Sequence, residues 1–114
     1  MKEIIERILK PVTLDENILF VGIYRIDGVP IYVHFKNKQV ISLIDWLESQ
    51  VRVLINYIAS GYFKDAEFRM TDSHLLLSPI SKTLVLTVLA VEDASIYKLR
   101  IDVESIKSEF EKYV

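Results

Sequence analysis

The chain has 114 residues, of which 51% are hydrophobic and 26% charged, and its net charge is −2. This composition suits a folded chain with one modest core, and the mildly acidic balance argues against a nucleic-acid-binding protein, whose footprint is a clustered basic face. No apolar run approaches the roughly 20 residues of a membrane-spanning helix, and no cysteine is present for disulfides or thiolate chemistry, so we expect one cytoplasmic domain over residues 1–114 with no membrane insertion.

The N-terminal segment predicts a helix followed by a buried strand. Apolar residues recur at helical spacing over residues 2–10, and we expect Pro11 to end this helix because proline lacks a backbone N–H. Residues 18–26 are apolar on both alternating faces, which is typical of an interior strand covered on both sides.

The Asp27-Gly28 pair predicts a tight turn after this strand. Two-residue hairpin turns need positive φ, so we expect Asp27 to accept a positive φ and to set the register of the hairpin. Residues 29–35 return as a second strand, and Pro30 places it at a sheet edge because proline cannot donate a ladder hydrogen bond. We therefore interpret Asp27 as a turn residue rather than a catalytic carboxylate.

The second half of the chain predicts a long helix, three strands and a final helix. In chain order these are a helix over 38–60 closed by Gly61, strands over 66–71, 74–80 and 84–91, and a helix over 95–112. The sum is an α+β fold in the order α-β-β-α-β-β-β-α. We expect a five-stranded antiparallel sheet with the central helix on one face and the N- and C-terminal helices on the other.

The central helix is more apolar than packing on a sheet requires. One apolar stripe spans an arc of about 120°, which is enough to pack against a sheet. Trp46, Val53 and Tyr57 form a second stripe beside it and widen the apolar arc to about 200°. Either another element of the chain covers this second stripe or it is a partner surface. Soluble monomers usually avoid such patches and aromatic anchors are favoured at interfaces, so we favour the partner surface.

The strand at 66–71 is expected to form the other edge of the sheet. It carries no lysine, proline or inward-pointing charge that would block pairing with another chain. Two antiparallel copies would place Glu67 and Arg69 across from each other. We therefore predict a homodimer through the central helix and this strand. The expected interface residues are Trp46, Val53, Tyr57, Glu67, Phe68, Arg69 and Met70.

No group of residues in the sequence points to catalysis. His34 and His74 lie 40 residues apart on different predicted strands, with no third metal ligand spaced around either. Residues 71–74 contain the residue types of a hydrolase triad, but neighbours on one hairpin cannot point at one another as a triad requires. The three glycines form no phosphate-binding motif. We expect no enzyme activity, no cofactor and no metal.

Three segments carry a resemblance to a known family. Asp27-Gly28-Val29-Pro30-Ile31 follows an apolar strand, and Leu75-Leu76-Leu77-Ser78-Pro79 precedes the run from Leu84 to Ala90. In this order they resemble the first hairpin and the later strand pair of the Roadblock/dynein light chain family. The order and length of the predicted elements match from residue 2 onward, so the resemblance covers nearly the whole chain.

The resemblance implies a profilin-like Roadblock domain that dimerises with its central helices side by side and its sheet continuous across the third strands. It also implies no intrinsic catalysis. Family members are scaffolds and regulators of small Ras-like GTPases, some of them GTPase-activating proteins, and light chains of motor complexes. A small GTPase is therefore an expected partner on the resemblance alone.

Two functional hypotheses of different classes follow. The first is a non-enzymatic homodimeric regulator or scaffold that binds a small Ras-like GTPase and modulates its GTP hydrolysis. The alternative is a small-molecule sensor module of the PAS or profilin-like kind. The sequence argues mildly against a sensor, because the predicted inner faces carry large aliphatic residues and few converging polar groups.

Overall fold

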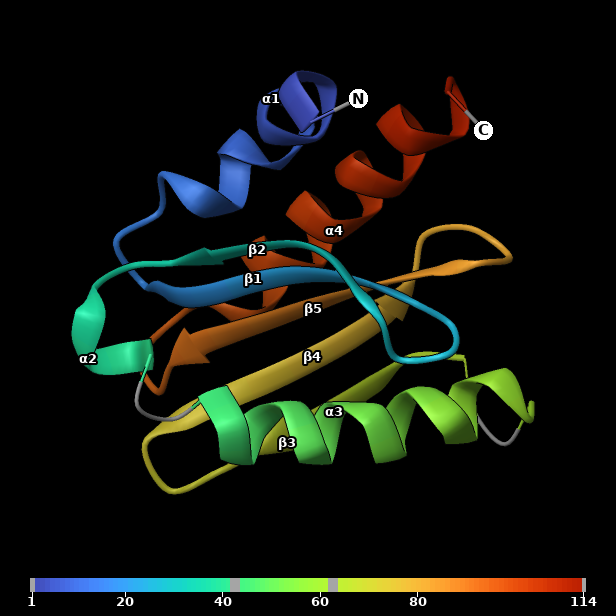
Figure 1. Ribbon diagram of the computed structural model, residues 1–114. Helices are drawn as coiled ribbons and strands as arrows, with labels where there is room; N and C mark the ends of the chain where they lie inside the picture. Colours follow the sequence, from blue (N-terminus) through green and yellow to red (C-terminus); the bar gives the residue numbers. More distant parts are fainter. Residues whose placement is uncertain (1, 42–43, 62–63, 114) are drawn as a thin grey trace.

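A computed structural model describes residues 2–41, 44–61 and 64–113, and it shows one sheet with helices on both faces (Figure 1). The sheet has five strands in the order β2-β1-β5-β4-β3, and all neighbouring strands are antiparallel. The elements are α1 (Lys2–Thr13), β1 (Ile18–Arg25), β2 (Pro30–Phe35), α2 (Lys38–Ile41), α3 (Ile44–Ala59), β3 (Ala66–Arg69), β4 (Ser73–Pro79), β5 (Leu84–Val91) and α4 (Ile96–Glu111). The predicted α+β class and the predicted placement of the two edge strands, β2 and β3, are confirmed.

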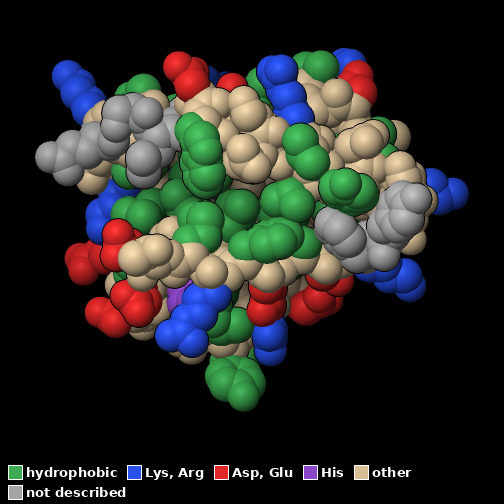
Figure 2. Space-filling model, turned by 90° about the horizontal axis from the view of Figure 1, so that it is seen from below, with side chains coloured by type: hydrophobic (Ala, Val, Ile, Leu, Met, Phe, Trp, Pro, Cys, Tyr) green, Lys and Arg blue, Asp and Glu red, His purple; other side chains and the backbone are tan. Residues whose placement is uncertain are grey.

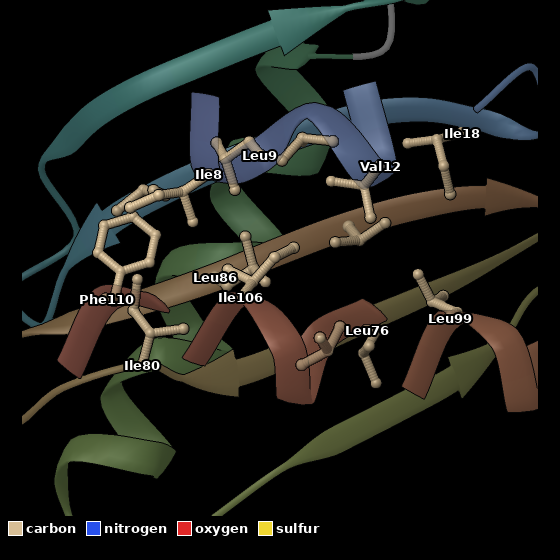
Figure 3. Close-up of a cluster of buried hydrophobic side chains, with 14 of the residues drawn as sticks. Ile8, Leu9, Val12, Ile18, Leu76, Ile80, Leu86, Leu99, Ile106 and Phe110 are labelled. Carbon is tan, nitrogen blue, oxygen red and sulfur yellow. The ribbon is translucent and has the colours of Figure 1, made fainter. Parts of the chain in front are cut away.

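The interior strands β1 and β5 are buried on both faces because each face of the sheet has its own core. Most residues of β1 and β5 are buried, which explains why both strands read as nearly continuous apolar runs. Helices α1 and α4 cover one face, and Figure 3 shows their buried side chains meeting those of the sheet. Helix α3 covers the other face, where Leu47, Val51 and Ile55 pack on Phe20 and Leu89.

A glycine in β1 makes room for two aromatic rings on the α3 side of the sheet. A Cβ atom at Gly22 would lie 2.7 Å from the Tyr24 ring and 2.8 Å from the Phe20 ring. Tyr24 is buried there, and burial raises the pKa of its phenol to about 12. Gly22 is therefore a packing requirement of this core.

The hairpin between β1 and β2 differs from the predicted turn. Gly28 has φ +91°, and among the described residues only glycines have a positive φ, so the expectation that Asp27 accepts a positive φ is wrong. The Gly28 N–H donates to the Arg25 carbonyl and the Arg25 N–H donates to the Val29 carbonyl, each at 2.8 Å. Three residues thus form the loop, as in a type I turn followed by a left-handed glycine. Asp27 supports it by pairing with the Arg25 side chain and accepting from the Val29 N–H.

Two helix boundaries also differ from the prediction. Helix α1 continues past Pro11 to Thr13, because Val12 is fully buried and its packing outweighs the one hydrogen bond that proline cannot donate. In place of a single helix over 38–60, the structure has α2 and α3, and residues 42 and 43 lie outside the described ranges. The final helix begins where expected, with the Ser95 hydroxyl accepting from the Lys98 N–H at 3.2 Å.

The Gly22→Ala variant should be less stable than the parent chain by about 1–3 kcal/mol, because the added methyl overlaps two rings in a filled core. Chemical denaturation measures this loss. The same substitution made in a Tyr24→Leu background should cost less, since one overlapping ring has gone. An equal cost in both backgrounds would show that overlap with the Tyr24 ring is not the cause.

Candidate protein-interaction surface

The second apolar stripe of the central helix is exposed in the structure. Trp46 is 58% exposed, Val53 54% and Tyr57 45%, although all three lie on a helix whose other side is buried in the core. The explanation that another element of the chain covers this stripe is therefore excluded for the residues that the structure describes. Among the described residues, the side chains of Trp46 and Val53 on this helix face are therefore largely open to solvent.

A groove between α3 and β3 extends this face toward the sheet edge. It has a volume of about 280 Å³ and lies beside the exposed stripe. We call it the α3–β3 groove; it is lined by Trp46, Leu47, Gln50, Val53, Leu54, Phe68, Arg69, Met70 and Leu75. Figure 2 shows hydrophobic side chains gathered across the middle of the face of the molecule that carries α3, with charged side chains around them. Continuous apolar surfaces of this kind are typical of interaction sites.

The edge strand β3 borders the groove and is paired on one side alone. Phe68 lies opposite Leu75 of β4, and Leu75 belongs to the core under α3, so Phe68 is on the α3 side of the sheet. It is 37% exposed. Glu67 lies opposite Leu76, which belongs to the core under α4, so Glu67 is on the other side. The predicted alternation of the strand is thus present, and its outer edge is open for pairing.

An ion pair ties β3 to the final helix on that other side. The Arg100 guanidinium donates from Nε to one carboxylate oxygen of Glu67 at 2.7 Å and from a terminal nitrogen to the other at 2.8 Å. These hydrogen bonds hold the pKa of the Glu67 carboxyl below its ordinary value. The pair is bidentate, which fixes its geometry, but it is largely exposed, so its net contribution to stability is small.

A second contact holds the start of the same strand. The Asp65 carboxylate accepts a hydrogen bond from the buried Ser78 hydroxyl and lies 3.4 Å from the Lys107 ammonium. Lys107 is about two helical turns beyond Arg100, so both cations face β3 from one side of α4. These two contacts position a four-residue strand that has a ladder partner on one side.

The structure brings together five of the seven predicted interface residues on one surface. Trp46, Val53, Phe68 and Met70 line the groove, and Tyr57 continues the same stripe of α3. Arg69 is also part of the groove lining, but the alternation of the strand places its side chain, like that of Glu67, on the opposite face of the sheet.

Sequence reasoning missed three residues of this region. Gln50 and Leu54 also line the groove; the helical pattern of α3 places Leu54 at the edge of the first apolar stripe and Gln50 between the two stripes. Arg100 pairs with Glu67 across 33 residues of sequence, and no local pattern marks such a pair. The helical periodicity was a usable signal for Leu54.

The candidate reactive groups take structural positions. The His74 ring nitrogen Nε2 lies 3.0 Å from the Glu92 carbonyl oxygen, where it bridges the start of β4 and the end of β5. Within residues 2–41, 44–61 and 64–113, no three His, Asp or Glu side chains gather as metal ligands. The helices in these ranges are all too short or too polar to cross a membrane.

Comparisons with known proteins agree with this architecture. The sequence model of the AF0774-like protein family matches residues 2–104. Among solved structures, MglB of Myxococcus xanthus has a TM-score of 0.79 at 17% identity, covering 97% of this chain and 87% of that one. A Roadblock/LC7 domain from Streptomyces avermitilis has a TM-score of 0.70 at 14% identity, covering 90% of each chain. No curated protein matches the sequence. At these identities the likeness establishes the fold, which is that of MglB and Roadblock/LC7 domains.

Removing the guanidinium of Arg100 should raise the pKa of Glu67 toward its ordinary value. Because that pKa is depressed in the folded chain, the pair stabilises the fold above the carboxyl's unfolded pKa, and this contribution is lost as pH falls through the folded pKa. NMR titration of the Glu67 side chain in Arg100→Gln measures the change. Arg69→Gln is the matched control, since Arg69 has no ion pair within the described ranges. A larger effect from Arg69→Gln would contradict the assignment.

Proposed function

The chain belongs to the AF0774-like protein family and has the fold of MglB and Roadblock/LC7 domains, and from this we propose a regulatory function. The chain is a self-associating, non-catalytic regulatory subunit that binds a small Ras-like GTPase. The proposal has two parts. One is a homodimer through α3 and β3, and the other is a GTPase partner.

The exposed apolar surface of α3 and β3 is the observation that carries the first part. An exposed Trp46 and Tyr57 beside a groove are the kind of aromatic anchors that dominate protein interfaces. An open strand edge adjoins them, and strand edges pair readily with other strands. A second copy presents both features in the same arrangement, so a two-fold axis beside β3 would bury them together.

The charges of β3 also suit a two-fold arrangement. Arg69 is exposed and unpaired within the described residues, and it lies on the same face of the strand as Glu67. In an antiparallel β3 pair, Arg69 of one copy approaches Glu67 of the other. Because Glu67 already accepts from Arg100, the second guanidinium would share this carboxylate rather than neutralise a free one.

A GTPase partner is supported by the resemblance of the sequence to the Roadblock family and by the likeness of the fold to MglB. The alternative of a small-molecule sensor is not favoured, because the space between α3 and the sheet is filled by buried aliphatic and aromatic side chains. A surface that dimerises leaves the remaining edge and faces of both copies for a partner.

Placing a lysine on the exposed stripe should dissociate the dimer. In Val53→Lys a charge would be buried without a partner at the proposed interface, and we expect the dimer dissociation constant to rise at least about tenfold. Sedimentation equilibrium over a concentration series measures it. The matched control is Ile101→Lys, because Ile101 is also an exposed aliphatic residue on a helix, at 69% exposure, but lies on α4.

The control should self-associate like the parent chain. A parent chain that remains monomeric at high micromolar concentration would overturn the dimer. Equal weakening by Val53→Lys and Ile101→Lys would place the interface elsewhere.

Binding to small GTPases of the source organism tests the second part. Each GTPase is loaded with GTP or GDP and titrated with the parent chain and with Val53→Lys, and binding is followed by biolayer interferometry. We expect at least one GTPase to bind with a preference for one nucleotide. Failure of every GTPase in both states would remove the GTPase proposal and leave the dimer untouched.

A further inference from the structure

The opposite edge of the sheet, β2, is open as well. The Lys36 N–H donates to the Leu19 carbonyl at 3.0 Å, which fixes which residues of β2 are bonded to β1. Bonded and non-bonded positions alternate in an antiparallel ladder. The backbone N–H and C=O groups of His34 therefore point toward β1 and pair with it. Those of Val33 and Phe35 point away from the sheet.

The same strand exposes apolar side chains. Ile31 is 45% exposed and Val33 38%, and Val29 just before the strand is 42% exposed. Val33 lies opposite Gly22, so it is on the α3 side of the sheet, but it does not belong to the core under that helix. Helix α2 packs beside β2 and adds Ile41, which is 51% exposed. An apolar strip thus follows the open strand edge.

Edge protection is confined to one end of β2. Pro30 begins the strand, and a register shift follows between it and Tyr32, so the hairpin end cannot extend a regular ladder. From Ile31 to Phe35 the strand carries no lysine and no charged side chain. Edge strands of monomeric proteins normally carry charged or proline residues that prevent pairing with another strand.

Cations without partners flank the strip. The aliphatic stem of Arg52 lies against the hairpin, with its Cγ 3.2 Å from where a Cβ of Gly28 would be. Lys38 begins α2 beyond the other end of β2. Neither makes an ion pair with any residue in the described ranges. Asp27, the acid of the hairpin, is already paired with Arg25.

We propose that the β2 edge binds an extended segment of a partner protein, with alternating aliphatic residues and acidic residues at both ends. Added as a sixth strand, the segment bonds to the outward backbone groups of Val33 and Phe35. Its aliphatic side chains pack on Ile31 and Val33, and its acids meet Arg52 and Lys38. This surface is separate from the α3–β3 groove and does not depend on the proposed dimer.

The size of the strip favours an extended segment over a second copy of the chain. Four partly exposed aliphatic side chains offer far less than the roughly 800 Å² per partner of a stable globular interface. A bound strand needs less side-chain area, because its main chain supplies hydrogen bonds.

A designed peptide tests the proposal on the full chain. The probe has a Val-Thr-Ile-Thr-Val core between two Asp-Glu pairs, and a second peptide replaces the acids by lysines. NMR titration to about 1 mM peptide detects even weak binding. We expect the acidic peptide to shift and protect the amides of Val33 and Phe35 and to bind at least about fivefold more tightly than the basic one at low salt.

Val33→Lys should weaken binding of the acidic peptide at least about tenfold. The lysine places a charge within the apolar strip and disfavours pairing of another strand with this edge. Val53→Lys on α3 should leave peptide binding unchanged, which separates this proposal from the dimer. The proposal is overturned if the acidic peptide does not bind, if Val33→Lys binds it as the parent does, or if the two peptides bind equally. It is also overturned if the chain forms assemblies that Val33→Lys abolishes, since the occupant is then a second copy.

Discussion

One face of the five-stranded sheet is covered by α3 and by the four-residue α2, whose Val40 joins the same core, and α3 is too narrow to cover the rest of that face. Strands lie about 4.8 Å apart, so five of them span roughly 24 Å, whereas a helix with its side chains is about 10–12 Å wide. On the opposite face α1 and α4 share the task and enclose the larger core (Figure 3). On its own face α3 covers the central strands and leaves an apolar strip on each side. One strip is the α3–β3 groove and the other lies along β2.

This mismatch gives a physical reason for the composition of α3. A helix that only had to pack on the sheet would need one apolar stripe. Trp46 and Val53 extend the apolar surface sideways over the groove, where the edge strand β3 offers Phe68. Strand β3 itself has four residues and a ladder on one side, so ion pairs to α4 help to hold it in place. An edge held in this way is already ordered before another strand pairs with it, which reduces the entropic cost of association.

The sequence predicted the elements whose signals are local and repeated. The continuous apolar runs of β1 and β5 indicated strands covered on both faces, and Pro30 and the unguarded 66–71 strand indicated the two edges. Positions set by tertiary packing were missed. Burial of Val12 carries α1 past Pro11, and the backbone at Asp27 keeps a negative φ because Gly28 supplies the left-handed position. The pairing of Arg100 with Glu67 depends on how α4 crosses β3, which no local pattern encodes.

Disulfide trapping across β3 tests the central claim most directly, since the chain has no native cysteine and any disulfide from a single introduced one joins two copies. Cysteines are placed singly from Ala66 to Met70, with Ile101→Cys as an exposed control on α4. A dimer with paired β3 strands brings one such position next to the two-fold axis, where the two Cβ atoms come within the roughly 4 Å that a disulfide needs. We expect rapid covalent dimer formation at that position and slow formation at Ile101→Cys. Uniformly slow formation along β3, or formation no faster than at the control, would contradict pairing through this edge.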